Sequence, residues 1–183
     1  MDRTSRPHAV DTIRASEPQD EVHLVRLAEV AFEDMGDYSH TILDWLRRPS
    51  TVTLVMSVGE GISGFVTYCY RRCDHDVYGD IIALAVDPVF RRQGIASRLL
   101  TRAITYLSAG APQVHASSLR LHVSAGNVAG QTVFQRLGFR FQVTDGYYPN
   151  GQQALRYVRD CLPPDRLSVE PDAEDTICSK SVG

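Results

Sequence analysis

The sequence lacks a long hydrophobic run and contains almost no lysine. No apolar stretch reaches the ~18 residues that a membrane-spanning helix needs, and residues 1–9 are polar, without the apolar core of a secretion signal. These absences predict a cytoplasmic protein without a membrane partner. Lys180 is the one lysine beside 18 arginines, and the formal net charge is −3. That charge excludes a general affinity for nucleic acid.

Cysteine and histidine are sparse and irregularly spaced. Four cysteines and six histidines form neither a Cys-x-x-Cys pair nor the spacing of a zinc site. Cys69 and Cys73 lie close together, but no second pair completes a metal site. We therefore expect free thiols and no metal.

The length predicts one domain flanked by two tails. A chain of 183 residues with 43% hydrophobic side chains can bury a sizeable core. We expect a flexible tail over residues 1–9 and a single domain over residues 10–161. Residues 162–183 carry five acidic and two basic side chains, so we expect this acidic tail to be disordered.

Residues 91–96, Arg-Arg-Gln-Gly-Ile-Ala, are the most informative segment. They follow the apolar run Gly79–Val86 and precede an amphipathic helix, so a strand leads into a tight loop that opens a helix. Backbone N–H groups at such a loop converge, and the helix N-terminus adds partial positive charge. This arrangement suits a phosphate group. The loop has neither the G-x-G-x-x-G of a dinucleotide fold nor the Gly-Lys-Ser/Thr of a Walker loop.

The chain after this loop predicts two helices and two strands. Apolar residues at helical spacing follow the loop, a strand covers residues 118–123, and Asn127 is a suitable N-cap for the second helix. That helix ends at Gly138, and a strand resumes at residues 139–141.

The front half of the sequence predicts one strand, two helices and a hairpin. The strand covers residues 10–14, and the helices cover residues 20–32 and 40–47, with a polar loop at 34–39 between them. Two further strands, residues 51–58 and 62–70, flank a Gly-Glu-Gly turn.

Three segments together resemble the GCN5-related N-acetyltransferase (GNAT) family. Arg91-x-x-Gly94-x-Ala96 resembles its coenzyme A pyrophosphate loop, and the segment from Leu121-His122-Val123 to Leu137-Gly138-Phe139 resembles its second cofactor motif. Residues 146–154 resemble the Tyr-Tyr loop of protein N-terminal acetyltransferases, in particular the ribosomal-protein alanine acetyltransferase group. The resemblance covers residues 10–160. It implies an α/β GNAT fold with a central mixed, mostly antiparallel sheet, splayed at the coenzyme A site, with helices on both faces.

The resemblance also implies that acetyl-CoA is the cofactor. The splayed strand would pair its backbone with the pantetheine amides, the loop would hold the pyrophosphate, and the second helix would contact the pantetheine arm. The cofactor-binding residues so implied are Leu84, Ala85, Val86, Arg91, Arg92, Gln93, Gly94, Ile95, Ala96, Ser97, Asn127 and Phe134. Asn127 could also serve only as the helix cap.

His122, Asp80 and Tyr148 are the candidate catalytic residues. By strand alternation, His122 faces away from Leu121 and Val123, and imidazole can accept a proton near neutral pH. His122 is the candidate general base, and Asp80 could hold a water or the ammonium. Either could instead be an ordinary strand residue. Many family members have a tyrosine acid where Phe134 stands, so Tyr148 or Tyr147 substitutes for it or the thiolate leaves unassisted.

The resemblance implies two loops that contact the acceptor. One contains Asp34 and Tyr38, and the other contains Tyr147. Each of these residues could instead be a plain loop or packing residue. We expect a protein N-terminus as the acceptor and a monomer or homodimer. A small-amine acceptor, and a coenzyme A-binding sensor without turnover, are the alternatives.

Overall fold

The computed structural model describes residues 12–35, 38–58, 61–73, 76–110 and 114–161. One seven-stranded sheet runs through the described chain in the order β1-β2-β3-β4-β5-β7-β6. Every neighbouring pair is antiparallel except β4 and β5, which are parallel. The mixed, mostly antiparallel sheet predicted from the sequence is therefore confirmed. The tails predicted at 1–9 and 162–183 lie outside the described residues.

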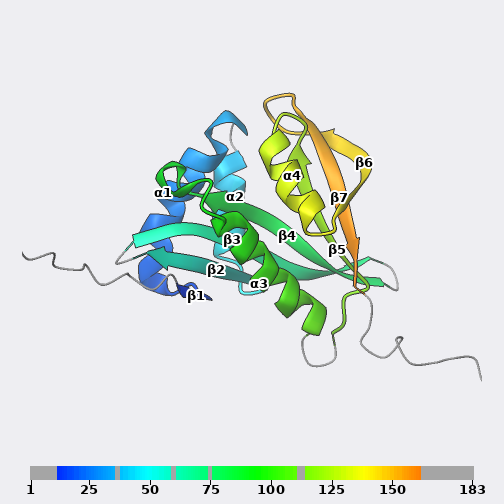
Figure 1. Cartoon of the computed structure of the whole chain (residues 1–183), viewed down its shortest axis with the longest axis horizontal. Coiled ribbons are helices and arrows are strands. Elements are labelled where there is room, and N and C mark those ends of the chain that lie inside the picture. Colours follow the sequence, from blue (N-terminus) through cyan, green and yellow to red (C-terminus); the bar gives the residue numbers. More distant parts are fainter. Residues whose placement is uncertain (1–11, 36–37, 59–60, 74–75, 111–113, 162–183) are drawn as a thin grey trace, which may run out of the picture.

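Four α-helices of the described chain lie between strands of this sheet, α1 and α2 in succession between β1 and β2 (Figure 1). In chain order, the strands and α-helices are β1 Thr12–Ala15, α1 Glu21–Phe32, α2 Tyr38–Leu46, β2 Thr51–Val58, β3 Gly61–Cys73, β4 Asp76–Val86, α3 Ile95–Ala109, β5 Ser118–Ser124, α4 Val128–Arg136, β6 Arg140–Tyr147 and β7 Gln153–Asp160.

Several boundaries differ from those that the sequence predicts. β3 and β4 extend to Cys73 and Asp76, because the ladder continues through polar residues that have no strand pattern of their own. α2 begins at Tyr38, inside the segment predicted as a loop. Tyr147 ends strand β6 and pairs with Gln153, although both lie in the segment 146–154 that resembles the Tyr-Tyr loop. Cross-strand pairing determines these boundaries, and local residue preference does not reveal it.

The sheet splits where β4 and β5 part. Their pairing runs from Tyr78↔Ser118 to Ile81↔Leu121, and β4 then continues to Val86 paired only with β3. At this point Ile82 is an extra residue in the β3–β4 ladder, a β-bulge that bends the strand. Figure 1 shows β2–β4 and the group β5, β7 and β6 diverging from their shared pairing. The splayed sheet implied by the resemblance is thus present.

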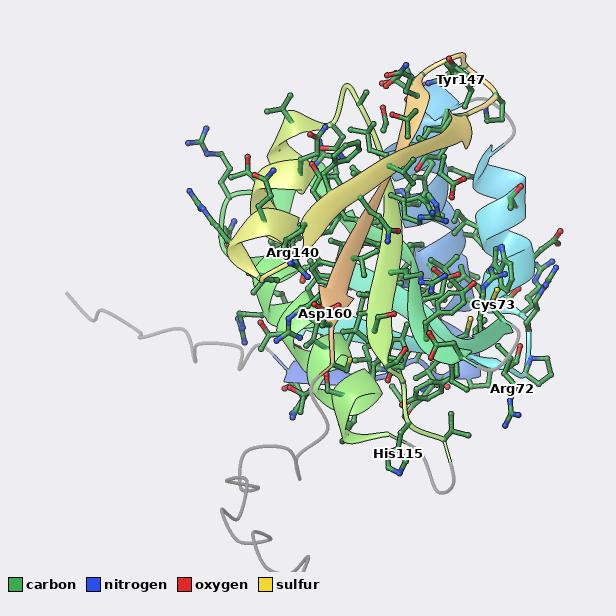
Figure 2. The ribbon with its side chains drawn as sticks, turned by 90° about the vertical axis from the view of Figure 1, so that its right-hand side faces the viewer. Arg72, Cys73, His115, Arg140, Tyr147 and Asp160 are labelled. Atoms are coloured by element: carbon green, nitrogen blue, oxygen red, sulfur yellow. The ribbon has the colours of Figure 1, made fainter. Side chains whose placement is uncertain are left out.

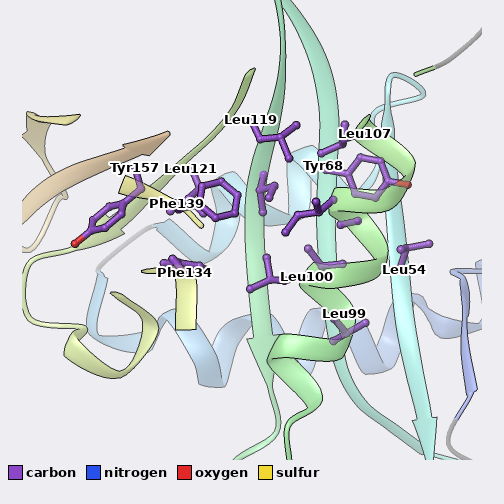
Figure 3. Packing of buried hydrophobic residues seen from close by; sticks show 14 of the residues in the cluster. Leu54, Tyr68, Leu99, Leu100, Leu107, Leu119, Leu121, Phe134, Phe139 and Tyr157 are labelled. Carbon is purple, nitrogen blue, oxygen red and sulfur yellow. The ribbon is translucent and has the colours of Figure 1, made fainter. Parts of the chain in front are cut away.

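Two hydrophobic clusters cover the two faces of the sheet. The cluster beneath α3 and α4 includes Leu99, Leu100 and Leu107 of α3 with Leu119 and Leu121 of β5 (Figure 3). The cluster beneath α1 and α2 joins side chains of these helices to β2, β3 and β4: Leu24, Leu27, Ala28, Phe32, Ile42, Val55, Phe65, Ala83 and Ala85. Helices therefore lie on both faces, as predicted.

A buried carboxylate ties β1 to the start of α1. Both oxygens of Asp20 accept hydrogen bonds from Arg14, at 2.6 and 2.9 Å, and Oδ2 also accepts from the backbone N–H of Glu17 at 2.8 Å. Asp20 is 5% exposed. The hydrogen bond from Arg14, more than any other interaction, lowers the pKa of Asp20 below its ordinary value.

Among the described residues, no helix is long and apolar enough to span a bilayer, and no three potential ligands lie close enough to hold a metal ion. Cys69, Cys73 and Cys161 are free thiols, and Cys178 lies outside the described residues.

Candidate active site

A pocket opens between β4 and β5 where their pairing ends. Five residues predicted from the sequence line it: Leu84, His122, Asn127, Phe134 and Tyr148. The other lining residues are Phe32, Met35, Ile81, Ile82, Ala83, Leu121, Val123 and Ser124. The splay thus brings together side chains that lie far apart in the chain. The pocket is largely apolar, with a few polar groups, as small-molecule sites commonly are.

His122 is held by a carboxylate from β6. Its Nε2 lies 2.8 Å from Oδ2 of Asp145, and that oxygen also accepts a hydrogen bond of 3.1 Å from Arg156. His122 and Arg156 are directly opposite in the β5–β7 ladder. The hydrogen bond with His122 is the main reason that the pKa of Asp145 lies below its ordinary value. An ionised carboxylate only accepts hydrogen bonds, so neutral His122 donates from Nε2 and keeps its lone pair on Nδ1.

Asn127 caps α4 at the edge of the pocket. Its Oδ1 accepts a hydrogen bond of 2.8 Å from the N–H of Gly130. A Cβ at Gly130 would lie 2.8–2.9 Å from the Asn127 side chain, so only glycine fits beneath this cap. The capping role is shown by this bond, and Asn127 lines the pocket at the same time.

Phe134 and Tyr148 contribute the aromatic part of the lining. Phe134 is 7% exposed and packs edge-on against Phe139, with ring centroids 6.3 Å apart. Tyr148 is 8% exposed and follows the end of β6 in a turn closed by Gly151, whose N–H donates to the Tyr148 carbonyl at 2.8 Å. Tyr148 is therefore the tyrosine that the fold brings to the pocket beside Phe134.

The loop before α3 has the backbone shape of an anion cradle. Arg92 has φ +64° and Gly94 has φ +79°, and the first α3 hydrogen bond is donated by Arg98 to Gly94. In the described part of the chain, no backbone N–H of residues 92–97 donates to another backbone group. Arg91 folds back, since its Nε donates to the carbonyl of Val86 at 3.2 Å.

Beyond the splay, β4 presents an open backbone edge. Leu84, Ala85 and Val86 pair with β3 on one side, and the pairing with β5 ends before them on the other. Ala85 is buried beneath α1 and α2, whereas Leu84 and Val86 pack against the α3 cluster. The edge between the pocket and the loop is therefore available to a further extended chain.

Asp80 lies beside the pocket and outside its lining. Its carboxylate pairs with Arg71 at 2.6 Å, and Arg71 stacks 4.6 Å from the ring centroid of Trp45. Burial of Asp80 raises its pKa, and the charges of Arg71 and His122 partly oppose this. A water or ammonium held by Asp80, as predicted, would therefore share its carboxylate with Arg71.

The two predicted acceptor loops meet. The side-chain amide of Asn150, between β6 and β7, donates to the backbone carbonyl of Asp34. Tyr147 ends β6 and is 70% exposed (Figure 2). Tyr38 is the first residue of α2, and its side chain lies outside the described residues. This contact joins the two loops next to Met35 and close to Tyr148, which both line the pocket.

Comparison with known proteins identifies the family. A profile of the acetyltransferase (GNAT) family matches residues 17–139. The chain belongs to the GNAT family. No curated protein sequence matches it.

Solved GNAT structures agree with this fold. Ard1 from Thermoplasma volcanium has a TM-score of 0.67 and 25% identity, over 83% of this chain and 98% of that chain. The ribosomal-protein-S18-alanine N-acetyltransferase from Escherichia coli has a TM-score of 0.66 and 18% identity, over 87% and 100%. Arabidopsis thaliana NAA60, solved with acetyl-CoA, has a TM-score of 0.63 and 18% identity, over 82% and 98%.

This GNAT protein is an acetyltransferase that uses acetyl-CoA. The chain fits that cofactor on its own geometry. The N–H groups of residues 92–97 suit a pyrophosphate, and the open edge at Leu84–Val86 suits the two amides of pantetheine. Phe134 offers an apolar contact at the pocket, where the acetyl end would lie.

Sequence reasoning missed the partners of His122. Asp145 and Arg156 lie 23 and 34 positions further along the chain, and no motif marks them. The β5–β7 register would have identified Arg156, but Asp145 reaches the site through irregular β6–β7 pairing. Phe32 and Met35 were missed because they look like ordinary helix-end residues.

Proposed function

We propose that this enzyme transfers acetyl from acetyl-CoA to the α-amine of a protein or peptide N-terminus. The observation that carries the proposal is the His122–Asp145 pair at the pocket, beside which Asn150 and Asp34 join the two loops. The likeness to the E. coli ribosomal-protein-S18-alanine enzyme supports an N-terminal acceptor.

His122 acts as the general base in this proposal. When bound, acetyl-CoA supplies an activated acetyl thioester. Nδ1 of His122 accepts the proton of the acceptor amine, directly or through water, while Asp145 fixes the ring through Nε2. Arg156 in turn holds Asp145. The chain thereby keeps the imidazole in one orientation and one tautomer before the acceptor arrives.

An α-amine suits this arrangement better than a lysine side chain. An α-amine with a pKa of about 7.7–8.0 is neutral in roughly a tenth to a sixth of molecules at pH 7, whereas a lysine amine at about 10.4 is neutral in roughly one in 2,500. A partly exposed imidazole is an adequate base for the first and a weak one for the second. The contact between the two loops beside the pocket also favours a chain end over the middle of an extended peptide.

Tyr148 is the proposed proton donor to the departing thiolate. Phe134 has no proton to give, and Tyr148 lines the same pocket. A thiol with a pKa of about 8.5 is a tolerable leaving group, so this acid would accelerate the reaction without being essential. Asp80 remains a candidate for positioning the ammonium through its place beside His122.

The test is acetylation of a library of peptides with free N-termini, followed by mass spectrometry. Acetylation should occur on the α-amine and fall by at least about a hundredfold in His122→Ala, as expected for loss of a general base. Asp160→Asn, an exposed change at the far end of β7, is the matched control. Acetylation restricted to lysine side chains would refute the proposal.

A small amine is the second candidate acceptor, because the same contact between the loops also favours a short substrate. A panel of small amines tested beside the peptides separates the two acceptors. If only the small amines react, the N-terminal assignment is wrong. If acetyl-CoA binds and neither set reacts, both proposed acceptor classes are wrong.

A further inference from the structure

On the sheet face that carries α1 and α2, the hydrophobic cluster of these helices includes no side chain of β5, β6 or β7, so the described helices leave this part of the face uncovered. α1 and α2 pack against β2, β3 and β4 on this face, while α3 and α4 pack on the other. Leu119, Leu121 and Val123 of β5 point into the α3 cluster, so Arg120 and His122 point to the uncovered face. In Figure 2 this side is seen with α2 on the right and the β6–β7 hairpin above.

Arg120 lies two residues before His122, the proposed general base, on the same face of β5. Its guanidinium lies 3.9 Å from the ring centroid of Tyr78, and it is opposite Asp80 in the β4–β5 ladder. Asp80 is already bound by Arg71 at 2.6 Å. The stacking on Tyr78 holds the guanidinium plane and leaves its edge N–H donors for another partner.

The charges around Arg120 favour an anion. On this face, the arginines Arg71, Arg120 and Arg156 stand beside two carboxylates, Asp80 and Asp145. Arg71 and Arg156 are paired with those carboxylates, which leaves Arg120 as the excess positive charge. Arg120 is half-buried, so an ion pair there is screened less by solvent than one on the open surface.

We propose that Arg120 binds a carboxylate of the acceptor and so selects N-termini with Asp or Glu at the second or third residue. This inference rests on the proposed N-terminal acetylation. Strand residues two apart are separated by about 6.6 Å, and an extended peptide advances about 3.3–3.6 Å per residue. A peptide whose α-amine is at His122 and whose chain runs along β5 therefore has its second and third side chains beside Arg120.

The test uses peptides that differ only by Glu or Gln at positions two and three, with a third set carrying the change at position seven. The wild-type enzyme should show kcat/KM about fivefold higher for the Glu peptides, the effect of one partly buried ion pair. The preference should shrink in high salt. No preference should appear at position seven.

Three variants test whether Arg120 causes the preference for the Glu peptides. Arg120→Gln should bring the Glu/Gln ratio to about one, and Arg120→Lys should keep part of it because the charge remains. Arg140→Gln removes an exposed arginine paired with Asp160 on the same half of the sheet and should keep the full ratio. A structural role for Arg120 would lower both rates equally and leave the ratio unchanged.

Three results would overturn the inference: a wild-type ratio of one, a ratio that survives in Arg120→Gln, or one that is lost equally in Arg140→Gln. Should no peptide be acetylated by the wild-type enzyme, the proposed function itself fails. Acetylation of both peptide sets without discrimination refutes the selection by Arg120 alone.

Discussion

Replacement of Gly94 tests whether the loop before α3 holds the pyrophosphate of acetyl-CoA. Gly94 has φ +79°, where a residue with a Cβ is about 1–2 kcal/mol less stable than glycine. A Cβ built there meets no protein atom within 4 Å. The protein itself therefore has room for the side chain, and the added atoms would enter the space around the loop that we assign to the ligand.

Gly94→Val should weaken acetyl-CoA binding at least tenfold, which corresponds to about 1.4 kcal/mol. Two effects contribute. The valine side chain occupies the space assigned to the phosphates, and relaxation of the strained backbone turns the N–H groups of residues 92–97 away from the ligand. The free energy of unfolding without ligand should fall by only about 1–2 kcal/mol. Calorimetric titration gives the dissociation constant, and denaturant unfolding gives the stability.

Gly146→Val is the matched control. Gly146 has φ +86° and, like Gly94, no atom within 4 Å of a built Cβ, but it lies in β6. It should lose similar stability and keep the dissociation constant for acetyl-CoA. Wild-type binding in Gly94→Val would refute the cradle, and equal weakening in Gly146→Val would show that backbone strain alone is responsible.

Three further changes test the acceptor side and the fold. Asp145→Asn should lower kcat/KM about fivefold, because a partly exposed charge-assisted bond to His122 contributes about 1 kcal/mol; an unchanged rate in steady-state assays would exclude a positioning role. Tyr148→Phe should lower kcat about tenfold, at the weak end for a general acid, with KM for acetyl-CoA unchanged; an unaltered kcat would mean that the thiolate leaves unassisted. Asp20→Asn should reduce the unfolding free energy at pH 7 by about 2 kcal/mol, since Arg14 loses its buried partner. The pKa of Asp20 is lowered in the folded state, so its contribution is present above the unfolded value of about 3.9 and is lost as pH falls through the folded value. Urea unfolding should therefore show the difference from wild type vanishing in strong acid, and a constant difference would contradict this.

Much of the fold could be predicted because its signals are local. The apolar residues of α3 recur at helical spacing, Asn127 caps α4, and Thr51–Val58 is a strand with the predicted bounds. The bulge at Ile82 and the end of the β4–β5 pairing have no such signal, since both depend on which strands are neighbours. The splay of the sheet was predicted only through the resemblance to the GNAT family.

In the candidate site too, local features could be predicted from the sequence and features that depend on strand pairing could not. The loop at residues 91–97 is contiguous, so its shape could be inferred from one glycine and a helix start. The pairing of His122 with Asp145 depends on β6 lying next to β7 with an irregular register. The position of Tyr148 in the pocket depends on the same hairpin. Sequence alone therefore indicated the cofactor side more completely than the acceptor side.

The cofactor side and the acceptor side of the site should respond differently to substitutions. Most groups assigned to acetyl-CoA lie on one strand edge and one loop, with Asn127 and Phe134 added from α4, whereas the acceptor side is assembled from β4, β5, β6 and the end of α1. Asp145 joins the base to the hairpin that also carries Tyr148 and the bridge from Asn150. A change in that hairpin therefore alters both the fit of the acceptor and the orientation of the base, so it affects kcat and acceptor KM together. A change in the loop before α3 should affect only the binding of acetyl-CoA, because no residue of that loop lines the pocket around His122.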